Sequence, residues 1–567
     1  MQLCTRHPSL PSIVRLLSCS LLIEGAIVLL AALLRLWQLD LKPPHFDEGI
    51  NGWFVDQMRV QSYYKYDPEN YHGPLYFYGL FISLSLLGRN LWALRMPAVL
   101  SSIASVWVVL RFKRYFGTIA ARFAALALAL SPGAVFYGRY AIHESWMVLS
   151  LLITTWGILG LWKSGARRDL IALISGITLL LLIKETAVIH IACFIIAAGV
   201  LAFWERLSPS LPAMPFAGRQ WTNRDLMCCC VLSALALIFF YSGTFFNMGG
   251  IADFFRAYAN WFHTGTGDGG HVKSDYQVDR LNYYWLNLIL AALPGQIGKD
   301  VGLLNYYWLA LMRWYEWPAL LGLLYGLRLA FPVRFFGGSM TRYVAVYAIG
   351  TFVAYSIVPY KTPWCIISII WPFALLFGCA VQEGWWIFKK MPGYGESPMG
   401  AAITAGILPA LLLGVSLCTT FRLNFLHFAD PAEPYVYVQT MPEIKIVTEP
   451  VLAMAQHDAR NYGMVGQILL DSYYPLPWVL GDFTGIGYYD KTNTPSVLDG
   501  DFILALTSQQ KMVEDHLKGS YLRRRFHLRD SMDECTVWFK ESLFHDWFSD
   551  PNHGSTDKVD LGSFSAP

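Results

Sequence analysis

The sequence has little charge for its length. Only 15% of its 567 residues are Asp, Glu, Lys or Arg, whereas 55% are hydrophobic and the mean hydropathy is +0.39. Water-soluble domains carry about a quarter of charged residues, so this composition argues against an ordinary soluble enzyme. The net charge is only +3 and no basic run stands out, which argues against a nucleic-acid-binding protein.

The ten cysteines lack the spacing of a metal site or of a disulfide framework. No Cys-x-x-Cys pair is present, and Cys228, Cys229 and Cys230 open an apolar run. We therefore expect neither a zinc site nor structural disulfides. The first apolar run also lacks a small-residue cleavage site before the polar Asp40. It is expected to be an uncleaved anchor rather than a removed signal peptide.

Long apolar runs dominate what remains, and several reach the 18 residues or more that cross a bilayer. Eleven spans are predicted, at about residues 16–38, 95–111, 118–136, 146–162, 169–184, 186–204, 226–246, 305–329, 343–359, 364–388 and 400–421. The apolar segment 75–88 is too short to cross and is expected to be an interfacial or re-entrant helix. The predicted fold class is a polytopic α-helical membrane protein.

The orientation of the spans follows from the basic residues in the short loops. One set of loops holds seventeen Lys and Arg against four acids, which predicts that these loops and the N-terminus are cytoplasmic. The opposite loops, including a first loop at 39–74 and a long one at 247–302, then lie outside. The chain is therefore expected to be a multi-pass protein of the inner or plasma membrane.

The character of the sequence changes at the end of the last span. We expect a transmembrane domain over 1–424 and a small extracytoplasmic α/β domain over 425–547. Strands are predicted at 435–440, 467–472, 501–506 and 535–539, and helices at 442–457 and 508–518. The polar segment 548–567 is expected to be a disordered tail. No nucleotide fingerprint and no internal repeat is evident; the second absence argues mildly against a repeat-built transporter.

Ionisable residues gather on the predicted outer side, at the ends of the spans. They are His45, Asp47, Glu48, His72, Arg95, Arg139, His143, Glu144, Lys184, Glu185 and Lys361. Charges in such places are costly unless they are paired or functional. A reaction on a lipid phosphate would use such a set, because a carboxylate takes a proton from an attacking hydroxyl and cations hold the departing phosphate.

The two motifs of the first outer loop also have a structural interpretation. Asp47 and Glu48 in "HFDEGIN" could be solvated acids that cap a helix beginning near Gly49. In "YHGPLYFY", the Gly-Pro pair could form a turn in an aromatic belt at the membrane interface. In the functional interpretation, the same pair sets the direction of the short helix 75–88 and leaves His72 at its mouth beside Asp47.

The later motifs are open to the same two interpretations. Arg139 and His143 are four residues apart, so both can face one site if the segment is helical. Lys184 and Glu185 stand between two spans with almost no loop, where they could be an ion pair in a tight turn. Lys361 could extend toward the interface, or it could hold a phosphate oxygen as a point charge.

Several motifs, taken in order, resemble one family. They are "HFDEGIN", "YHGPLYFY", "RMPAVL", "SPGAVFYGRYAIHESW", "IKET" and "YKTPW", followed by "PYVYVQT" and "YPLPWVLGDF". Together they resemble the flippase-activity-associated family of multi-spanning proteins found beside archaeal and bacterial glycosylation genes. That family looks like a branch of the C-type (GT-C) glycosyltransferases, similar to the protein O-mannosyltransferases and the lipid A aminoarabinose transferases.

The resemblance implies that a sugar passes from a polyprenyl-phosphate carrier to an acceptor at the outer face. The Asp-Glu pair of the family's first outer loop corresponds here to Asp47 and Glu48. The Lys/His-Pro-Pro-Leu motif that ends this loop corresponds to His72-Gly73-Pro74-Leu75, with Gly in place of the first Pro. An acid of a second outer loop corresponds to Glu144, where the superfamily often has Asp. Close relatives vary in metal dependence; none is expected here, and a divalent metal is the alternative.

The expected reaction is a direct displacement in which Asp47 is the general base and the anomeric centre inverts. Partners are then the lipid-linked donor, the bilayer, and a protein, lipid or polysaccharide acceptor. The alternative is a transport component that handles lipid-linked sugars without catalysis. Transporters need their charges near mid-membrane, whereas these charges stand at predicted span ends. A purely structural partner of a glycosylation complex would not explain the clustered ionisable residues.

Overall fold

The computed structural model describes residues 10–207, 217–265, 307–330, 338–358, 361–390, 398–490, 493, 495, 497–553 and 557–559. The chain forms two compact units. The first, here called the helical unit, consists of residues 1–39, 63–88 and 95–427. The second, here called the α/β unit, consists of residues 40–62, 89–94 and 428–567. The first outer loop is therefore shared between the two units, whereas the sequence-based boundary at 424 places all of it with the spans.

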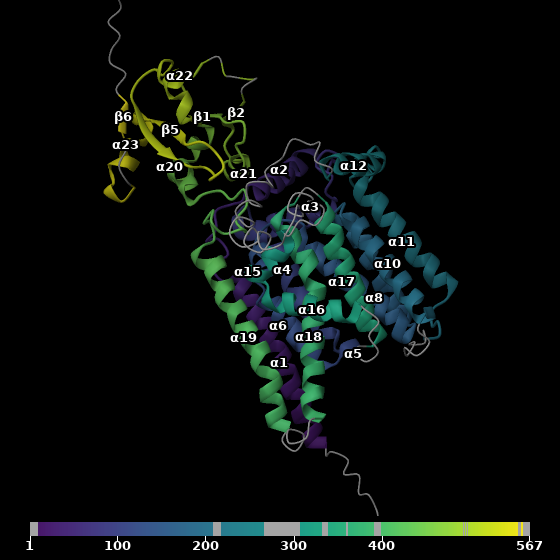
Figure 1. Ribbon diagram of the computed structural model, residues 1–567. Coiled ribbons are helices and arrows are strands. Elements are labelled where there is room, and N and C mark those ends of the chain that lie inside the picture. The colour runs from purple at the N-terminus through teal and green to yellow at the C-terminus, as the bar shows by residue number, and fades with distance from the viewer. Residues whose placement is uncertain are drawn as a thin grey trace, which may run out of the picture. The chain divides into compact units, whose positions relative to one another are not determined.

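The helical unit is built from long apolar helices packed side by side (Figure 1). Its helices are α1 (Leu10–Leu36), α3 (Leu75–Leu87), α4 (Leu91–Arg111), α5 (Lys113–Phe116), α6 (Thr118–Ala129), α7 (Pro132–Gly138), α8 (Glu144–Ser164), α9 (Arg167–Ile183), α10 (Ala187–Leu207), α11 (Asn223–Tyr241), α12 (Gly250–Gly265), α15 (Tyr307–Tyr315), α16 (Trp317–Ala330), α17 (Ser339–Ile357), α18 (Ile366–Lys390) and α19 (Pro398–Phe421). The first residues of α4 belong to the α/β unit. At the centre, α18 packs against α6, α16, α17 and α19.

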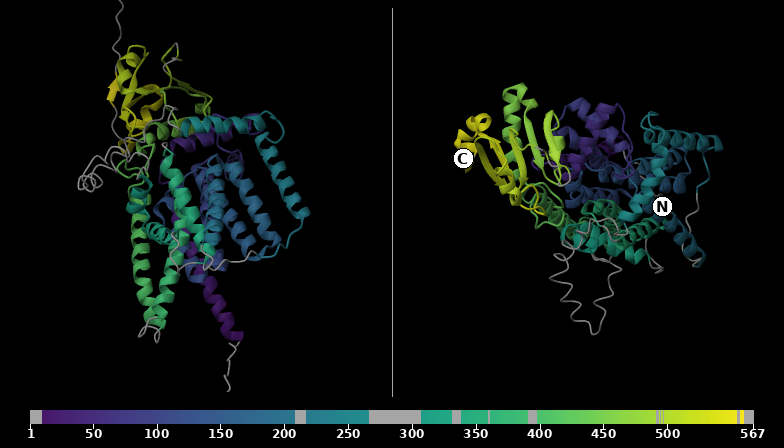
Figure 2. Two further views of the ribbon diagram at one scale, coloured as in Figure 1. Left: turned by 45° about the vertical axis from the view of Figure 1, so that its right-hand side comes forward. Right: turned by 90° about the horizontal axis from the view of Figure 1, so that it is seen from above.

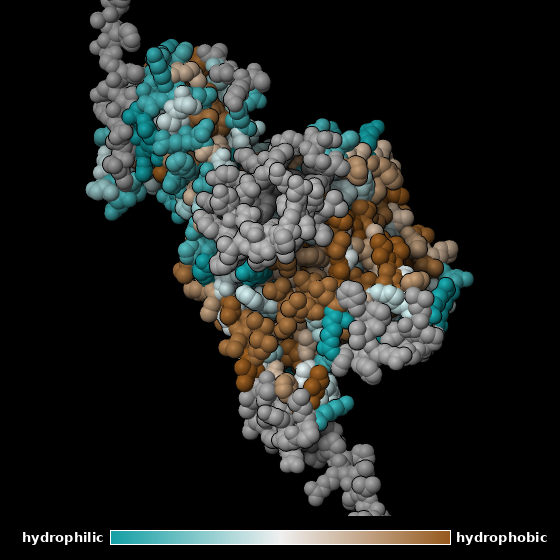
Figure 3. All heavy atoms as spheres, in the orientation of Figure 1, coloured by the Kyte–Doolittle hydropathy of each residue, from teal (hydrophilic) through white to brown (hydrophobic). Residues whose placement is uncertain are grey.

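Six helices in the described residues are long and apolar enough to cross a membrane, or seven if the bent pair α6 and α7 counts as one span. Every span predicted from the sequence coincides with a helix or a helix pair, but the number eleven stays a prediction. The short segment 75–88 forms the 13-residue helix α3, as expected. Hydrophobic side chains cover much of the surface of the helical unit in Figure 3, as a surface in contact with lipid requires.

Breaks between helices place polar groups inside the helical unit. The pair α6 and α7 bends by 58° at Ser131, whose hydroxyl accepts a hydrogen bond from the Ala134 N–H (3.0 Å) and so caps α7. A second break separates α9 from α10 at Lys184 and Glu185. A third separates α15 from α16 at Glu316, whose carboxylate accepts from the Gly133 N–H (2.7 Å) at the start of α7. Each break thus brings ionisable or hydroxyl side chains to helix ends.

The α/β unit contains a six-stranded sheet with the order β2-β1-β3-β5-β4-β6. Figure 2 shows this sheet from two further directions, in green to yellow. The strands are β1 (Val465–Leu469), β2 (Gly485–Tyr489), β3 (Phe502–Leu506), β4 (Tyr521–Phe526), β5 (Cys535–Lys540) and β6 (Asp557–Val559). β1 runs parallel to both β2 and β3, and the remaining pairs are antiparallel. The helices of this unit are α2 (Phe46–Gln61), α20 (Lys445–His457), α21 (Leu476–Val479), α22 (Gln510–Glu514) and α23 (Glu541–Ser549).

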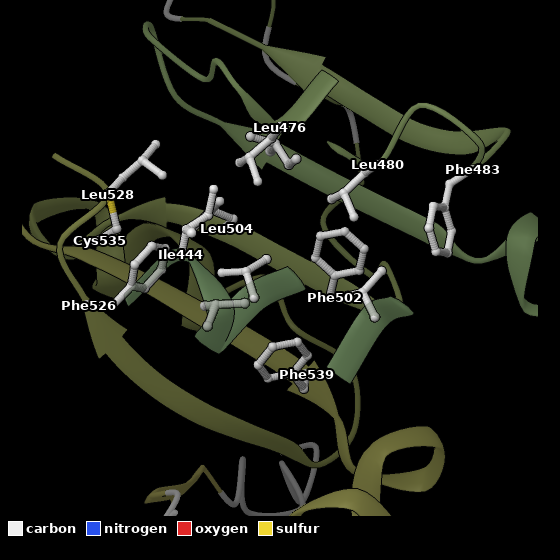
Figure 4. Packing of buried hydrophobic residues seen from close by; sticks show 14 of the residues in the cluster. Ile444, Leu476, Leu480, Phe483, Phe502, Leu504, Phe526, Leu528, Cys535 and Phe539 are labelled. Carbon is white, nitrogen blue, oxygen red and sulfur yellow. The ribbon is translucent and has the colours of Figure 1, made fainter. Parts of the chain in front are cut away.

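Side chains alternate between two hydrophobic cores, one on each face of the sheet. Phe502 and Leu504 of β3 join the larger core, which Figure 4 shows with residues of α21 and β5. Ile503 and Ala505 point to the opposite face, where they pack with Trp538. Because successive residues of a strand face opposite sides, two covered faces explain why β3 is apolar at every position.

The strands of the α/β unit follow the sequence-based expectations only in part. The segments 467–472, 501–506 and 535–539 contain β1, β3 and β5, with shifted ends. Residues 435–440 form no strand; they make one isolated bridge, from Thr440 to Arg529. β2, β4 and β6 were not predicted. β6 lies within the expected disordered tail and pairs with β4, while residues 560–567 lie outside the described residues.

Candidate functional site

The first outer motif forms the start of α2, where His45 is the N-cap. The Nδ1 atom of His45 accepts a hydrogen bond from the Asp47 N–H (3.1 Å). The Glu48 carboxylate accepts from the His45 N–H (2.8 Å), which completes a capping box. The helix therefore begins at Phe46, three residues before the expected start. Glu48 therefore caps the helix, as the structural interpretation of the motif expects, but it is buried and not solvated.

The capping box separates the roles of the two acids. Glu48 is fully buried and its carboxylate is bound to the helix start. The side chain of Asp47 is 31% exposed, and its nearest ion-pair partner is the His45 ring, 3.8 Å away. Since His45 Nδ1 already accepts a hydrogen bond from a backbone N–H, it does not donate to Asp47. Of the two carboxylates, Asp47 is thus the one open to a substrate.

Gly73 explains how the second outer motif is held. Its N–H donates to the carbonyl of Ile183 (3.0 Å), at the end of α9. A Cβ atom added at this position would lie 2.2 Å from the carbonyl oxygen of Leu182. A proline here would lose the hydrogen bond and would clash as well. The departure from the family's Pro-Pro pattern is therefore a requirement of this close backbone contact.

Lys184 and Glu185, at the break between α9 and α10, each contact a residue from another segment of the chain. His72 Nδ1 lies 2.9 Å from the Glu185 carboxylate. Lys184 donates to the carboxylate of Glu144, at the start of α8. Both side chains of the second pair are buried, with exposed fractions of 7% and 4%. Buried charges are tolerated when they are paired in this way.

His143 completes this cluster from the turn before α8. Its ring centroid lies 4.6 Å from that of His72 and 4.4 Å from that of Tyr76. The residue is 2% exposed, and its Nε2 atom is buried without a hydrogen-bond partner in the structure. A buried polar atom without a partner is costly and is common where a substrate completes the site. Residues 72, 143, 144, 184 and 185 thus form one acid–base cluster.

Arg95 and Arg139 instead bind the end of α1. Arg139 donates to the carbonyls of Leu34, Arg35, Trp37 and Gln38 at 2.6 to 3.3 Å. Arg95 donates to the carbonyl of Leu39 (2.6 Å). The last carbonyls of a helix have no partner within the helix, and cations are favoured there. These contacts give both guanidinium groups a part in ending α1; whether either also holds phosphate stays a prediction.

Lys361 has a comparable place at the end of α17. Its ammonium group donates to the carbonyls of Tyr355 (3.1 Å), Ser356 (3.0 Å) and Val358. A lysine has three donors, so these three carbonyls use all of them. The residue is 5% exposed and does not extend toward water. Neither interpretation made from the sequence, extension to the interface or phosphate binding, describes this contact.

The sequence did not single out His190, a second buried histidine. It is fully buried, with Nδ1 2.8 Å from the hydroxyl of Tyr347 and Nε2 3.2 Å from that of Tyr355. An ionisable residue inside an apolar span is the signal that could have identified it. Among the residues that the structure describes, no three His, Cys, Asp or Glu side chains form a group that could hold a metal ion.

Comparison with known proteins identifies relatives of this architecture. The profile of the family described as dolichyl-phosphate-mannose-protein mannosyltransferase matches residues 71–217, about a quarter of the chain. That segment includes His72 and the residues of the α9–α10 break. The comparison with curated proteins found no match.

Two solved structures of one protein resemble the whole chain. The structure of ArnT from Cupriavidus metallidurans bound to undecaprenyl phosphate is 15% identical, and the match covers 94% of this chain and 99% of that one with a TM-score of 0.50. The structure of the same protein in the apo state is 13% identical with the same coverage and a TM-score of 0.49. The chain therefore shares the fold of ArnT, and with the profile match this confirms the expected resemblance to the protein mannosyltransferases and the ArnT-type transferases.

Proposed function

We propose that the protein is a membrane glycosyltransferase that takes a sugar from a polyprenyl-phosphate-linked donor. The observation that carries the proposal is the buried acid–base cluster at the α9–α10 break, with an ion pair and an unsatisfied histidine nitrogen. The ArnT-like fold supports it, because that relative is described with undecaprenyl phosphate bound. The family profile over residues 71–217 supports it as well, since it names a lipid-phosphate sugar donor.

In the proposed reaction, the acceptor hydroxyl attacks the anomeric carbon of the sugar. Asp47 takes the proton of that hydroxyl, while the bond between the anomeric carbon and the phosphate oxygen breaks. Polyprenyl phosphate leaves with the bonding electrons, so it needs no general acid. Attack from the face opposite the phosphate inverts the anomeric centre, by the logic of an inverting glycosidase with the hydroxyl in place of water.

Among the four cations considered, the hydrogen bonds favour Lys184 as the ligand of the phosphate. Arg95, Arg139 and Lys361 donate to backbone carbonyls at helix ends. Lys184 donates to a side-chain carboxylate, and a lysine has two further protons to offer. His143 Nε2, which is buried and has no hydrogen-bond partner among the described residues, is a second group that can bind a polar part of the donor.

The direct test is mass spectrometry of surface glycans from cells with and without the protein. Loss of one sugar from a defined glycan on deletion, restored by the intact gene, is the expected result. Unchanged glycans, together with a protein-dependent movement of the donor lipid across the bilayer, would establish the transport alternative instead. An unchanged glycan profile without lipid movement would contradict both functions.

The orientation is a separate prediction. The excess of Lys and Arg in one set of loops places the N-terminus in the cytoplasm and the C-terminal domain outside. Protease added to intact spheroplasts should therefore degrade the segment after residue 427 and leave the spans intact. A cytoplasmic marker protein should stay uncut as the control. Protection of the C-terminal segment until the cells are lysed would reverse the orientation.

A further inference from the structure

The start of α2 is packed against the segment that follows strand β1, within the α/β unit. After β1 the chain continues through Ser472 into α21, and α21 contacts α2. A Cβ atom at Gly49 would lie 2.4 Å from the Cα of Pro475, and one at Gly52 would lie 2.3 Å from the Trp478 ring. The region beyond the carboxyl ends of parallel strands is where open α/β sheets usually bind their ligands. Here a segment from the first outer loop occupies it.

His45 connects the helix start to the C-terminal part of the chain. Its Nε2 atom lies 2.7 Å from the carbonyl oxygen of Tyr437. Because a carbonyl only accepts, Nε2 carries the proton, and the Nδ1 atom is then free to accept from the Asp47 N–H. One neutral imidazole therefore joins the backbone of Asp47 to the backbone of Tyr437.

Arg529 supports the same helix start from the other side. Its guanidinium carbon lies 5.0 Å from the centre of the Phe46 ring, the residue before Asp47. Its nitrogens donate to the carbonyls of Tyr474 and Ser472, which fixes the group in place. Burial lowers the pKa of Arg529 to about 10, which leaves it charged at neutral pH. A charged group over an aromatic face is attracted to it.

The later part of α2 is fixed as well. Arg89 donates to the carboxylate of Asp56 and to the carbonyl of Trp478, and its Nε lies 3.6 Å from Asp482. The amide of Gln439 donates to the carbonyl of Pro43 (3.2 Å), before the helix begins. The helix that carries Asp47 is thus bound before its start and at its start by residues from the C-terminal part of the chain, and in its later part through Arg89, which also contacts Trp478.

We propose that the C-terminal domain positions the general base, with His45 as the positioning residue that connects the two. The inference rests on the proposed function of Asp47 and gives the domain a role in the reaction. A displacement of about 1 Å at a reacting group lowers turnover by about a hundredfold. The contacts of His45 and Arg529 would prevent such a displacement.

Two substitutions at position 45 test the hydrogen bonds of the two ring nitrogens one at a time. Asparagine can accept from the Asp47 N–H as Nδ1 does, and it is a preferred N-cap, but it is too short to donate to the Tyr437 carbonyl. Glutamine reaches the place of Nε2 and can donate to that carbonyl, but it is a weaker cap. We expect His45→Asn to lower kcat about a hundredfold with an unchanged KM for the donor, and His45→Gln to retain more of kcat while lowering the thermal unfolding midpoint.

The measurement is the turnover of the reconstituted full-length variants with a panel of undecaprenyl-phosphate-linked hexoses and pentoses, paired with the unfolding midpoint of each variant. His516→Asn, on an exposed histidine of the same domain, is the matched control. Wild-type kcat in His45→Asn, or a larger loss in His45→Gln than in His45→Asn, would overturn the inference. If Asp47→Asn is also fully active, the proposed role of Asp47 as the base fails as well; if Asp47→Asn is inactive, only the inference on His45 fails. If the wild-type protein transfers no sugar, the proposed function itself fails.

Discussion

Replacing Asp47 with asparagine should abolish sugar transfer while the protein stays folded in the membrane. Asparagine has nearly the shape of aspartate but cannot take a proton from the acceptor hydroxyl. The Asp47 side chain is 31% exposed and its carboxylate lies 3.8 Å from the His45 ring, while the cap uses the backbone N–H of Asp47, so loss of the carboxylate should not unfold α2. Removal of a general base lowers the rate by about 10² to 10⁴. Binding of undecaprenyl phosphate should persist, because the base does not hold the phosphate.

A substitution of Glu48, the acid next to Asp47, provides the most direct comparison with Asp47→Asn. Glutamine at position 48 can still accept from the His45 N–H, because Gln as well as Glu serves in a capping box. Glu48→Gln should therefore retain most of the turnover, and Asp546→Asn, an exposed acid of the same unit, should retain all of it. Full activity of Asp47→Asn with an inactive Glu48→Gln would transfer the role of base to Glu48.

The predicted spans coincide with helices or helix pairs, because an apolar run in lipid must satisfy its backbone hydrogen bonds internally, and a helix does so. The sequence also identified the cluster around Lys184, since ionisable residues at span ends are rare enough to be noticed. It could not show that Gly73 closes that cluster, because the contact joins backbone atoms of residues 73 and 182. The only sign of such a backbone contact in the sequence is the glycine itself, and a single glycine does not say which distant segment it meets.

The roles of the basic residues could not be predicted for a related reason. Arg139 and Lys361 look like phosphate ligands in the sequence, because they are cations on a side with few others. The structure gives them the last carbonyls of α1 and α17 as partners. Helix ends need such donors as much as a phosphate does, and composition does not distinguish the two. Similarly, no local sequence pattern indicates that residues 40–62 belong to the same unit as residues 428–567, which begin more than 360 residues later.

Lys184, the cation that remains as the proposed phosphate ligand, gives the second prediction with a large effect on transfer. Lys184→Met should lower transfer about a hundredfold or more, because loss of one donor to a developing negative charge costs about 2–4 kcal/mol in the transition state. The same change also leaves the buried Glu144 carboxylate without its partner, and breaking a buried pair costs about 3–5 kcal/mol of stability. A single substitution therefore cannot separate phosphate binding from folding.

The double variant Glu144→Gln/Lys184→Met separates them, because it removes both charges of the pair. Its unfolding midpoint should recover relative to either single variant, while its transfer rate should stay as low as that of Lys184→Met. Lys361→Met is the matched control: it removes a buried lysine whose partners are three helix carbonyls, so it should lower the unfolding midpoint and keep transfer at temperatures where it is folded. Recovery of transfer in the double variant would mean that the Lys184–Glu144 pair only holds α8 against the α9–α10 break, and the phosphate would then need another ligand.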